Sequence, residues 1–171
     1  MSSEIYFPAE DSYLMQKVLQ EKISNLLKEN SDLKVLEIGA GSGIQLVVLQ
    51  QLGVKNIFSS DINSYAVVQC KNLGFDCIQS DLFEKIKGKY HLIIFNPPYL
   101  PDDEREPQES KLATTGGKNG SEIISKSLIQ APNFLKKDGR IFLLTSSLTK
   151  NINWQNYKKT PLLTDIKTKD L

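Results

Sequence analysis

The feature that most limits how this chain can fold is the apolar run at residues 92–95, which is followed at once by Asn-Pro-Pro-Tyr. A continuous run of β-branched and aromatic residues predicts a strand that is buried on both faces of a parallel sheet. Pro97 and Pro98 cannot donate hydrogen bonds to a sheet, so the strand must end at Asn96. Asn96 therefore stands at the carboxyl end of a strand, which is where open α/β sheets bind ligands.

The Asn-Pro-Pro-Tyr turn also predicts a small pocket. The side-chain oxygen of Asn96 and the backbone carbonyl of Pro97 are hydrogen-bond acceptors, and the ring of Tyr99 offers a flat wall. Two acceptors beside an aromatic face suit a planar group that carries an NH2. The turn is therefore the first candidate for a substrate site.

Length and charge exclude several classes of protein. A chain of 171 residues, 40% of them hydrophobic, is expected to form one domain, with an N-terminal cap and helix at 1–32, a core at 33–146 and a short tail at 147–171. The net charge of +1 lacks the excess expected of a protein that binds duplex phosphates. No apolar run approaches the ~20 residues of a membrane span, and the first residues lack a secretory signal pattern.

The few cysteine and histidine residues argue against a metal site and against a disulfide framework. Cys70, Cys77 and His91 are the only residues of these two types, which is too few for a four-ligand zinc site or a disulfide framework. We expect a cytoplasmic protein with reduced thiols, no bound metal and no membrane contact.

Short β-type runs alternate with amphipathic patterns along the rest of the chain, which predicts a doubly wound, mostly parallel α/β sheet. Asp11 or Ser12 is expected to cap the first helix. Residues 102–119 predict a long loop over the site, and a short helix near Trp154 and a strand at 162–166 are expected in the tail. Helices are expected at 12–30, 44–52, 64–72 and 121–135, and strands at 34–38, 56–60, 75–80, 92–95 and 140–145.

A glycine loop follows the first predicted strand, in the pattern Glu37-x-Gly39-x-Gly41-x-Gly43. A dinucleotide fingerprint needs a small residue at the next place, where this chain has Ile44, so NAD is disfavoured. The pattern instead resembles the first motif of class I S-adenosylmethionine-dependent methyltransferases, with a Rossmann-like fold. In that reading the glycines admit the methionine part of the cofactor, and Glu37 attracts its ammonium group.

Acidic residues follow the next two predicted strands. Asp61 is placed to accept both ribose hydroxyls, and Asp81 can accept from the adenine amino group while the N–H of Leu82 donates to a ring nitrogen. These strand ends share one crevice with the glycine loop, so together they predict the cofactor site much more strongly than any one of them alone.

The Asn-Pro-Pro-Tyr turn resembles that of methyltransferases acting on an NH2 conjugated to a planar π system. Asn96, Pro97 and Tyr99 are the candidate catalytic residues, and residues 96–99 the candidate substrate site, with Pro98 included and Asn96 also near the cofactor. If Asn96 and the Pro97 carbonyl accept the two N–H bonds, the nitrogen lone pair is directed toward the methyl carbon. Alignment is then the main catalytic task.

Two further segments, 6–12 and 115–122, resemble those of the HemK-like release-factor glutamine methyltransferases, in the small eukaryotic and archaeal branch. The resemblance covers residues 5–146. It implies that Ser12 touches the cofactor and that residues 96–99 hold the glutamine of the Gly-Gly-Gln loop of a class 1 translation release factor, giving N5-methylglutamine.

The chain departs from that family at two places. His91 stands where members usually have an acidic residue, and the tail after residue 146 is short for the expected final helix and hairpin, so a sheet edge is left exposed. In this branch a small zinc-binding activator commonly pairs with the third strand, which implies a similar partner near residues 76–80 here.

Two other functions stay open. The enzyme could act on an adenine or guanine amino group in DNA or RNA, which requires a flipped base and a phosphate-binding track. The domain could also be a truncated relative that binds cofactor or a partner without turnover. Three residues could instead have a purely structural role. Tyr99 could pack in the core, and Glu10 and Asp11 could cap a helix.

Overall fold

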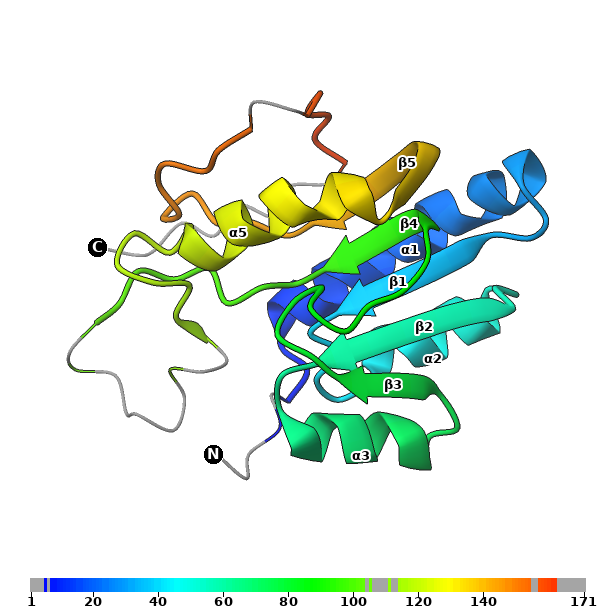
Figure 1. The fold of residues 1–171 in the computed structure, drawn as a ribbon, viewed down its shortest axis with the longest axis horizontal. Coiled ribbons are helices and arrows are strands. Elements are labelled where there is room, and N and C mark those ends of the chain that lie inside the picture. The colour runs from blue at the N-terminus through cyan, green and yellow to red at the C-terminus, as the bar shows by residue number, and fades with distance from the viewer. Residues whose placement is uncertain are drawn as a thin grey trace.

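The computed structural model describes residues 5, 7–103, 105, 111, 114–154 and 157–162. Figure 1 shows one sheet with its strands running in a common direction and helices against it. The helices are α1 (Glu10–Glu29), α2 (Ile44–Gln51), α3 (Ser64–Asn72), α5 (Glu122–Gln130) and the short 3-10 helix η1 (Ala131–Asn133). The strands are β1 (Lys34–Ile38), β2 (Asn56–Asp61), β3 (Asp76–Gln79), β4 (Tyr90–Phe95) and β5 (Leu135–Leu143).

The sheet has five parallel strands in the order β3-β2-β1-β4-β5. The strand order reverses between β1 and β4, because the chain leaves the middle of the sheet in one direction for β2 and β3 and returns to the other side of β1 for β4 and β5. The predicted doubly wound parallel fold is therefore confirmed. Its switch point lies where the glycine loop after β1 and Asn96 after β4 come side by side.

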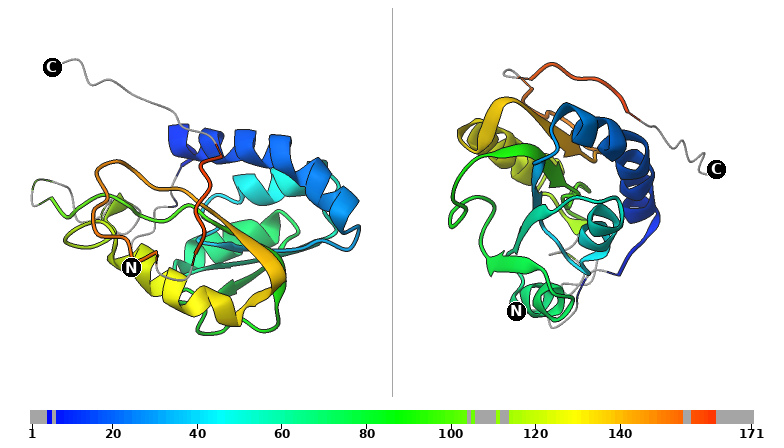
Figure 2. Two further views of the ribbon diagram at one scale, coloured as in Figure 1. Left: turned by 90° about the horizontal axis from the view of Figure 1, so that it is seen from above. Right: turned by 90° about the vertical axis from the view of Figure 1, so that its right-hand side faces the viewer.

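Apolar side chains cover both faces of the sheet. On one face α1 and α2 pack on β1 and β4 through a cluster that includes Leu19, Ile23, Val35 and Ile94, and α3 extends the same layer to β3. On the other face the segment between β3 and β4, together with α5 and η1, covers the sheet. Figure 2 shows these two layers from the side.

Several predicted boundaries are wrong, most of all at β5, which begins at Leu135 and not at residue 140. The first helix begins at Glu10 with Ala9 as its N-cap, and Ser12 lies in its first turn, with its Oγ 3.4 Å from the N–H of Ala9. The helix α5 stops at Gln130, because Pro132 falls within the short helix η1 that follows. The segment 102–119, predicted as a loop, includes helical residues at Lys111 and Thr114. A bridge joins Thr115 to Leu100, so this segment is tied to the substrate turn.

The last strand has an irregular register. Leu135 pairs with Tyr90 but Arg140 pairs with Leu92, so the intervening residues bulge out of the sheet, with Asp138 at a φ of 62°. The predicted Asp-Gly turn is therefore present, but inside the strand. No described strand pairs with the outer edge of β5, and Tyr157 in the tail donates its hydroxyl to the carbonyl of Leu128. The predicted strand at 162–166 lies outside the described residues except for Leu162. Trp154 and Tyr157, the anchors of the predicted short helix, are described outside any helix, although the N–H of Tyr157 donates to the carbonyl of Trp154 at 2.9 Å.

Polar groups at the amino-terminal end of the sheet are paired. The Nδ1 atom of His91 accepts the backbone N–H of Lys34 at 2.9 Å, and its Nε2 lies 2.6 Å from the side chain of Asn30. Arg140 pairs with Glu29 at 3.0 Å. His91 is thus a structural residue at the start of β4, and partial burial, aided by Lys136, lowers its pKa below 6.5.

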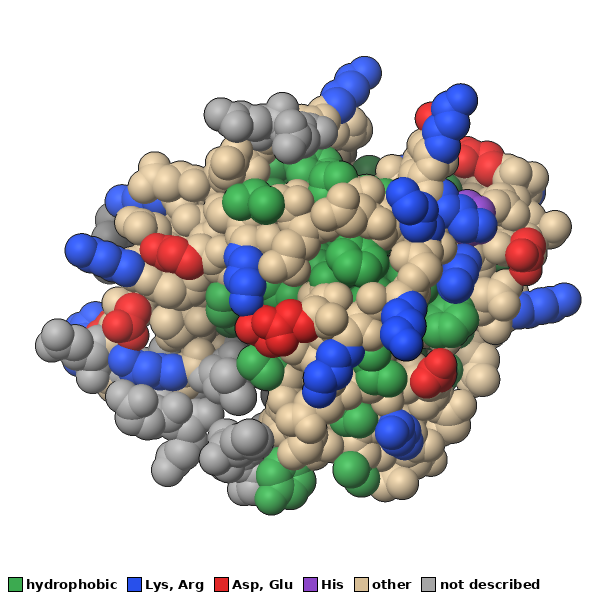
Figure 3. All heavy atoms as spheres, in the orientation of Figure 1, with side chains coloured by type: hydrophobic (Ala, Val, Ile, Leu, Met, Phe, Trp, Pro, Cys, Tyr) green, Lys and Arg blue, Asp and Glu red, His purple; other side chains and the backbone are tan. Residues whose placement is uncertain are grey.

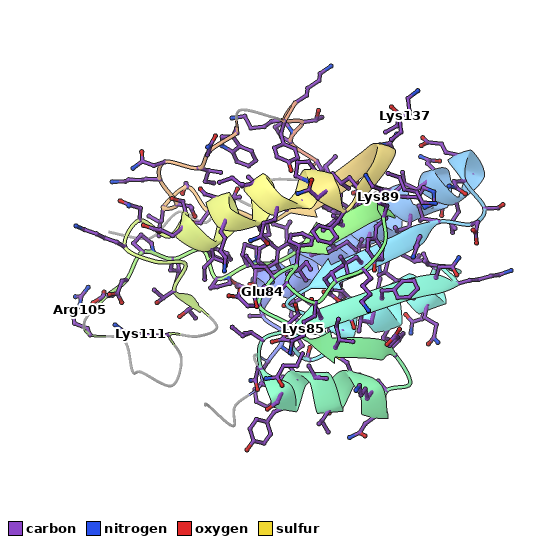
Figure 4. All side chains as sticks on the ribbon, viewed as in Figure 1. Glu84, Lys85, Lys89, Arg105, Lys111 and Lys137 are labelled. Carbon is purple, nitrogen blue, oxygen red and sulfur yellow. The ribbon has the colours of Figure 1, made fainter. Side chains whose placement is uncertain are left out.

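Basic side chains gather near the same end. Figure 3 shows Lys and Arg side chains on the side of this face where β4 and β5 begin. Lys89, labelled in Figure 4, directly precedes β4, and Lys137, also labelled, lies near the start of β5.

No helix in the described part of the chain is long and apolar enough to cross a bilayer.

Candidate active site

A cavity of about 350 Å³ lies at the carboxyl ends of the strands, a size typical of small-ligand sites. Glycine-loop residues form one side, and Asn96, Pro97 and Pro98 form another. Four carboxylates and one cation line it, contributed by Asp11, Glu37, Asp61, Asp81 and Lys126. A cavity with this charge favours a ligand that carries positive charge and hydrogen-bond donors.

Asp61 fixes the glycine loop. Its Oδ2 accepts the N–H of Gly41 at 2.8 Å, and its Oδ1 accepts the N–H of Asn63 at the same distance. Gly41 has a φ of 52°, in the left-handed region that glycine adopts without steric cost. Burial raises the pKa of Asp61, against the opposing effect of these backbone hydrogen bonds. The carboxylate thus joins the ends of β1 and β2 at the predicted ribose site.

Glu37 is the most unusual carboxylate of the cavity. Its side chain is 2% exposed, and its Oε2 has no hydrogen-bond partner among the described residues. Burial, reinforced by the nearby charge of Asp61, raises the pKa of Glu37 well above 4.5. An isolated buried carboxylate is costly, so a cationic ligand is the partner that this position lacks.

Asp81 already has a partner in the cavity. Lys126 of α5 lies 2.8 Å from its Oδ2, which leaves Oδ1 for a ligand. The neighbouring Leu82 has a φ of 46°, although it is not glycine, and its side chain is anchored in the apolar layer over the sheet. This strained backbone turns the chain at the predicted adenine site, as often happens at ligand-binding positions.

Asn96 is held in one orientation. Its Nδ2 donates to Oδ2 of Asp11 at 3.1 Å, and its Oδ1 is buried without a partner among the described residues. The other oxygen of Asp11 accepts the N–H of Ser12 at 2.7 Å. Burial, with the nearby charge of Asp11 and a hydrogen bond to it, raises the pKa of Tyr99. Asp11 therefore links the first helix, the cofactor side and the substrate turn.

Two glycines support the Asn-Pro-Pro-Tyr turn from behind. A Cβ atom on Gly116 would lie 2.5 Å from the carbonyl oxygen of Pro98, and one on Gly120 would lie 2.4 Å from that of Tyr99. Thr149 donates its hydroxyl to the same Tyr99 carbonyl at 2.8 Å. Only glycine permits this close approach, so the segment that follows the long loop positions the substrate turn.

A model of the methyltransferase small domain family matches residues 17–153. The chain belongs to this family. A putative protein N5-glutamine methyltransferase, MJ0928 of Methanocaldococcus jannaschii, is 44% identical over 85% of this chain and 74% of that protein. Methyltransferase HEMK2 of Mus musculus is 30% identical over 83% of this chain and 72% of that protein. The predicted membership in the HemK-like methyltransferases is confirmed.

A bacterial relative is much longer than this chain. The release factor glutamine methyltransferase of Lactococcus lactis is 31% identical over 72% of this chain, which spans only 52% of that protein.

Solved structures agree on the fold of this methyltransferase. A ribosomal protein L11 methylase from Lactobacillus delbrueckii superposes with a TM-score of 0.60 at 18% identity, over 81% of this chain and 61% of that one. The Thermus thermophilus 16S rRNA methyltransferase RsmC, solved with AdoMet and guanosine, gives 0.58 at 16% identity, over 85% and 36%. Family and fold together identify S-adenosylmethionine as the cofactor, as predicted.

Most of the predicted site residues of this methyltransferase line one cavity, but two do not. Gly43 is the N-cap of α2, where a Cβ would meet Leu73 at 2.9 Å, and Tyr99 packs against the apolar core beside the cavity. The predicted residues that line it are Ser12, Glu37, Gly39, Gly41, Asp61, Asp81, Leu82, Asn96, Pro97 and Pro98.

Sequence reasoning missed several lining residues, among them Asp11, Gln45 and Lys126. Asp11 lies next to Ser12, but its bond to Asn96 spans 85 residues and no local pattern reveals it.

Proposed function

We propose that this methyltransferase transfers a methyl group from S-adenosylmethionine to the side-chain amide of the glutamine in the Gly-Gly-Gln loop of a class 1 translation release factor. The names of its relatives support this substrate. The observation that carries the proposal is the buried Oδ1 of Asn96, which has no hydrogen-bond partner among the described residues, while Nδ2 of the same side chain is held by Asp11. A primary amide supplies the N–H that this oxygen lacks.

The cofactor supplies an electrophilic methyl group on a sulfonium. An amide nitrogen is a weak nucleophile because its lone pair is delocalised over the carbonyl. Asn96 Oδ1 and the Pro97 carbonyl would accept its two N–H bonds and would orient the lone pair, which lies perpendicular to the amide plane, toward the methyl group. The nitrogen would take the methyl group from the sulfonium, which would leave as a neutral thioether, and would then lose a proton to water. Positioning is the main contribution of the protein.

The cofactor residues follow from the same proposal. Glu37 holds the ammonium group, Asp61 the ribose hydroxyls, and Asp81 with the Leu82 N–H the adenine. Ser12, Gly39 and Gly41 line the methionine side of the site, and Gly43 begins the helix that follows the glycine loop. The unpartnered Oε2 of Glu37 supports this arrangement, because the ammonium supplies the charge and the donors that this oxygen lacks.

Mass spectrometry of a class 1 release factor tests the reaction. After incubation with this protein and S-adenosylmethionine, we expect one added methyl group on the glutamine of the Gly-Gly-Gln loop. A release factor with that glutamine changed to alanine is the control and stays unmodified. Methylation of DNA or RNA in place of the release factor would contradict the proposal.

The charges near the cavity favour a protein substrate over nucleic acid. Arg105 and Lys111 extend from the segment after the substrate turn (Figure 4), and each is paired, Arg105 with Asp103 at 2.7 Å and Lys111 with Asp102 at 2.6 Å. Cations that are already paired contribute less to a phosphate track.

A zinc-binding activator subunit at β3 is part of the proposal. The outer edge of β3 is not paired with any described strand, and the neighbouring α3 exposes Val68 and Tyr65, which are 57% and 50% exposed. An open edge beside exposed apolar side chains suits strand addition by a partner. Co-expression with a small zinc-binding subunit should yield a stable complex, and Val68→Asp should prevent its formation.

A cytoplasmic location follows from the proposed substrate, because translation termination takes place in the cytoplasm.

A further inference from the structure

Gln45 is a buried polar residue in the first turn of α2, immediately after the glycine loop. Its side chain is 3% exposed and lines the cavity, whereas the neighbouring Leu46 and Leu49 belong to the apolar core. A glutamine at such a position carries a desolvation cost unless all its polar atoms find partners. Its hydrogen bonds therefore need to be accounted for atom by atom.

The orientation of the Gln45 amide is fixed by chemistry. Its Nε2 lies 2.8 Å from the backbone carbonyl oxygen of Ser12. A carbonyl only accepts, so the NH2 end of the amide must face it. The other end, Oε1, is then buried with no hydrogen-bond partner among the described residues. Turning the amide over would place two oxygens against each other, so the unpartnered atom is the acceptor.

Two acceptors on the cofactor side of the cavity wall are buried without a hydrogen-bond partner among the described residues. They are Gln45 Oε1 and Glu37 Oε2. Both require a donor from a ligand, and the raised pKa of Glu37 makes a cationic donor the favourable one. An α-ammonium group provides three N–H donors and the matching charge.

We propose that Gln45 Oε1 is a second acceptor, beside Glu37, for the α-ammonium group of the cofactor. The inference rests on the proposed cofactor site and adds a residue that holds the amino acid end. Through its Nε2 the same side chain ties the start of α1 to the start of α2. Binding of the ammonium group therefore also fixes the helix that carries Asp11 and Ser12.

A purely structural tie between the two helices is the competing explanation. In that case loss of the amide lowers the affinity of the cavity for every ligand by the same factor. As a ligand to the ammonium, Gln45 instead affects only molecules that carry the amino group. A thermodynamic cycle over protein and ligand separates these two cases.

Calorimetry with S-adenosylhomocysteine, and with its analogue in which hydrogen replaces the α-amino group, tests the proposal. Gln45→Met keeps the length of the side chain and removes both polar ends. We expect Gln45→Met to weaken the binding of S-adenosylhomocysteine about tenfold more than that of the deamino analogue. This difference in affinity corresponds to one hydrogen bond to a charged group. Equal weakening of both ligands, or none, would overturn the role of Gln45.

Gln50→Met is the matched control, because Gln50 is an exposed glutamine of the same helix, and it should leave both affinities unchanged. If Gln45→Met does not fold, the unmutated protein answers the question by NMR. The side-chain carbonyl resonance of Gln45 should shift with S-adenosylhomocysteine and stay in place with the deamino analogue, and equal shifts would overturn the proposal. Failure of the unmutated protein to bind S-adenosylhomocysteine would overturn the cofactor site itself, and this inference with it.

Discussion

The two ends of the sheet differ in how their polar side chains are paired. At the carboxyl ends of the strands, four buried oxygens have no partner within the described parts of the chain, and all four belong to the cavity or adjoin it. They are Glu37 Oε2, Gln45 Oε1, Ser60 Oγ and Asn96 Oδ1.

At the amino-terminal end, His91 is bonded to Lys34 and Asn30, and Arg140 to Glu29. The difference shows which polar groups serve folding and which serve a ligand. Unpaired buried acceptors cost free energy in the ligand-free protein, and a ligand recovers that cost. Substitutions at the two ends should therefore differ in whether they change activity or stability.

The largest effect is expected from Asn96→Ala. Loss of the acceptor leaves the amide nitrogen unaligned, so kcat should fall by about 10³-fold, the scale of removing one oriented transition-state contact. The melting temperature should fall by only about 2–4 °C, because the one hydrogen bond lost is that from Asn96 Nδ2 to Asp11. Initial rates by mass spectrometry and a thermal melt measure both. Methylation at near full rate would show that Asn96 does not align the substrate.

Gly116→Ala should have the next largest effect. The added Cβ would lie 2.5 Å from the Pro98 carbonyl, so the substrate turn must shift. A displacement of this kind costs about 10²-fold in kcat while cofactor affinity is kept. Lys118→Ala, at an exposed position of the same segment, is the control and should be neutral. Equal rates for the two variants would mean that the turn does not depend on this support.

Glu37→Gln should separate binding from stability. Affinity for S-adenosylmethionine should fall about tenfold or more, while the free energy of unfolding of the ligand-free protein rises by about 1 kcal/mol, since a buried charge is removed. Calorimetry and denaturant unfolding measure the two quantities. A variant that is both weaker in binding and less stable would contradict the view that Glu37 is maintained for the ligand.

The pH dependence of the same residue has a defined sign. Between pH 4.5 and the raised native pKa of Glu37, the folded state binds more protons than the unfolded state. Stability of the ligand-free protein should therefore decrease as pH rises through this window. Glu37→Gln should reduce that slope, and the part that remains comes from Asp61, whose pKa is also raised by burial.

The smallest effect on activity is expected from His91→Phe. Methylation should stay within about twofold, and stability should fall by about 1 kcal/mol because the Lys34 N–H loses its acceptor. The lowered pKa of His91 gives a slope opposite to that of Glu37. As pH falls below 6.5 the unfolded state takes up the proton first, so stability is lost, and His91→Phe should abolish this loss. Unfolding curves between pH 5 and pH 8 measure it.

The sequence predicted the sheet because the strands are short apolar runs bounded by glycine, asparagine or proline. The predicted bounds of β1 are those observed, and α2 and β2 agree within one residue. The prediction failed where tertiary contacts decide. Ala9 caps α1 although it has no side-chain acceptor, and β5 includes a bulge before Arg140 that its pattern does not show.

Strand ends placed Asp61, Asp81 and Asn96 at one edge, because parallel strands end together. The pairing of Asp81 with Lys126, and that of Gln45 with Ser12, depends on helices that pack from elsewhere in the chain. No periodicity contains that information.

The bulge in β5 has a consequence for self-association. A regular outer strand would offer a row of N–H and carbonyl groups to a second molecule. Here the residues between Leu135 and Arg140 leave the plane of the sheet, and Lys136, Lys137 and Asp138 are all exposed. Charge and irregularity at that place hinder edge-to-edge stacking into fibres. The part of β5 that contributes least to its hydrogen-bond ladder is thus the part least suited to pairing with a second molecule.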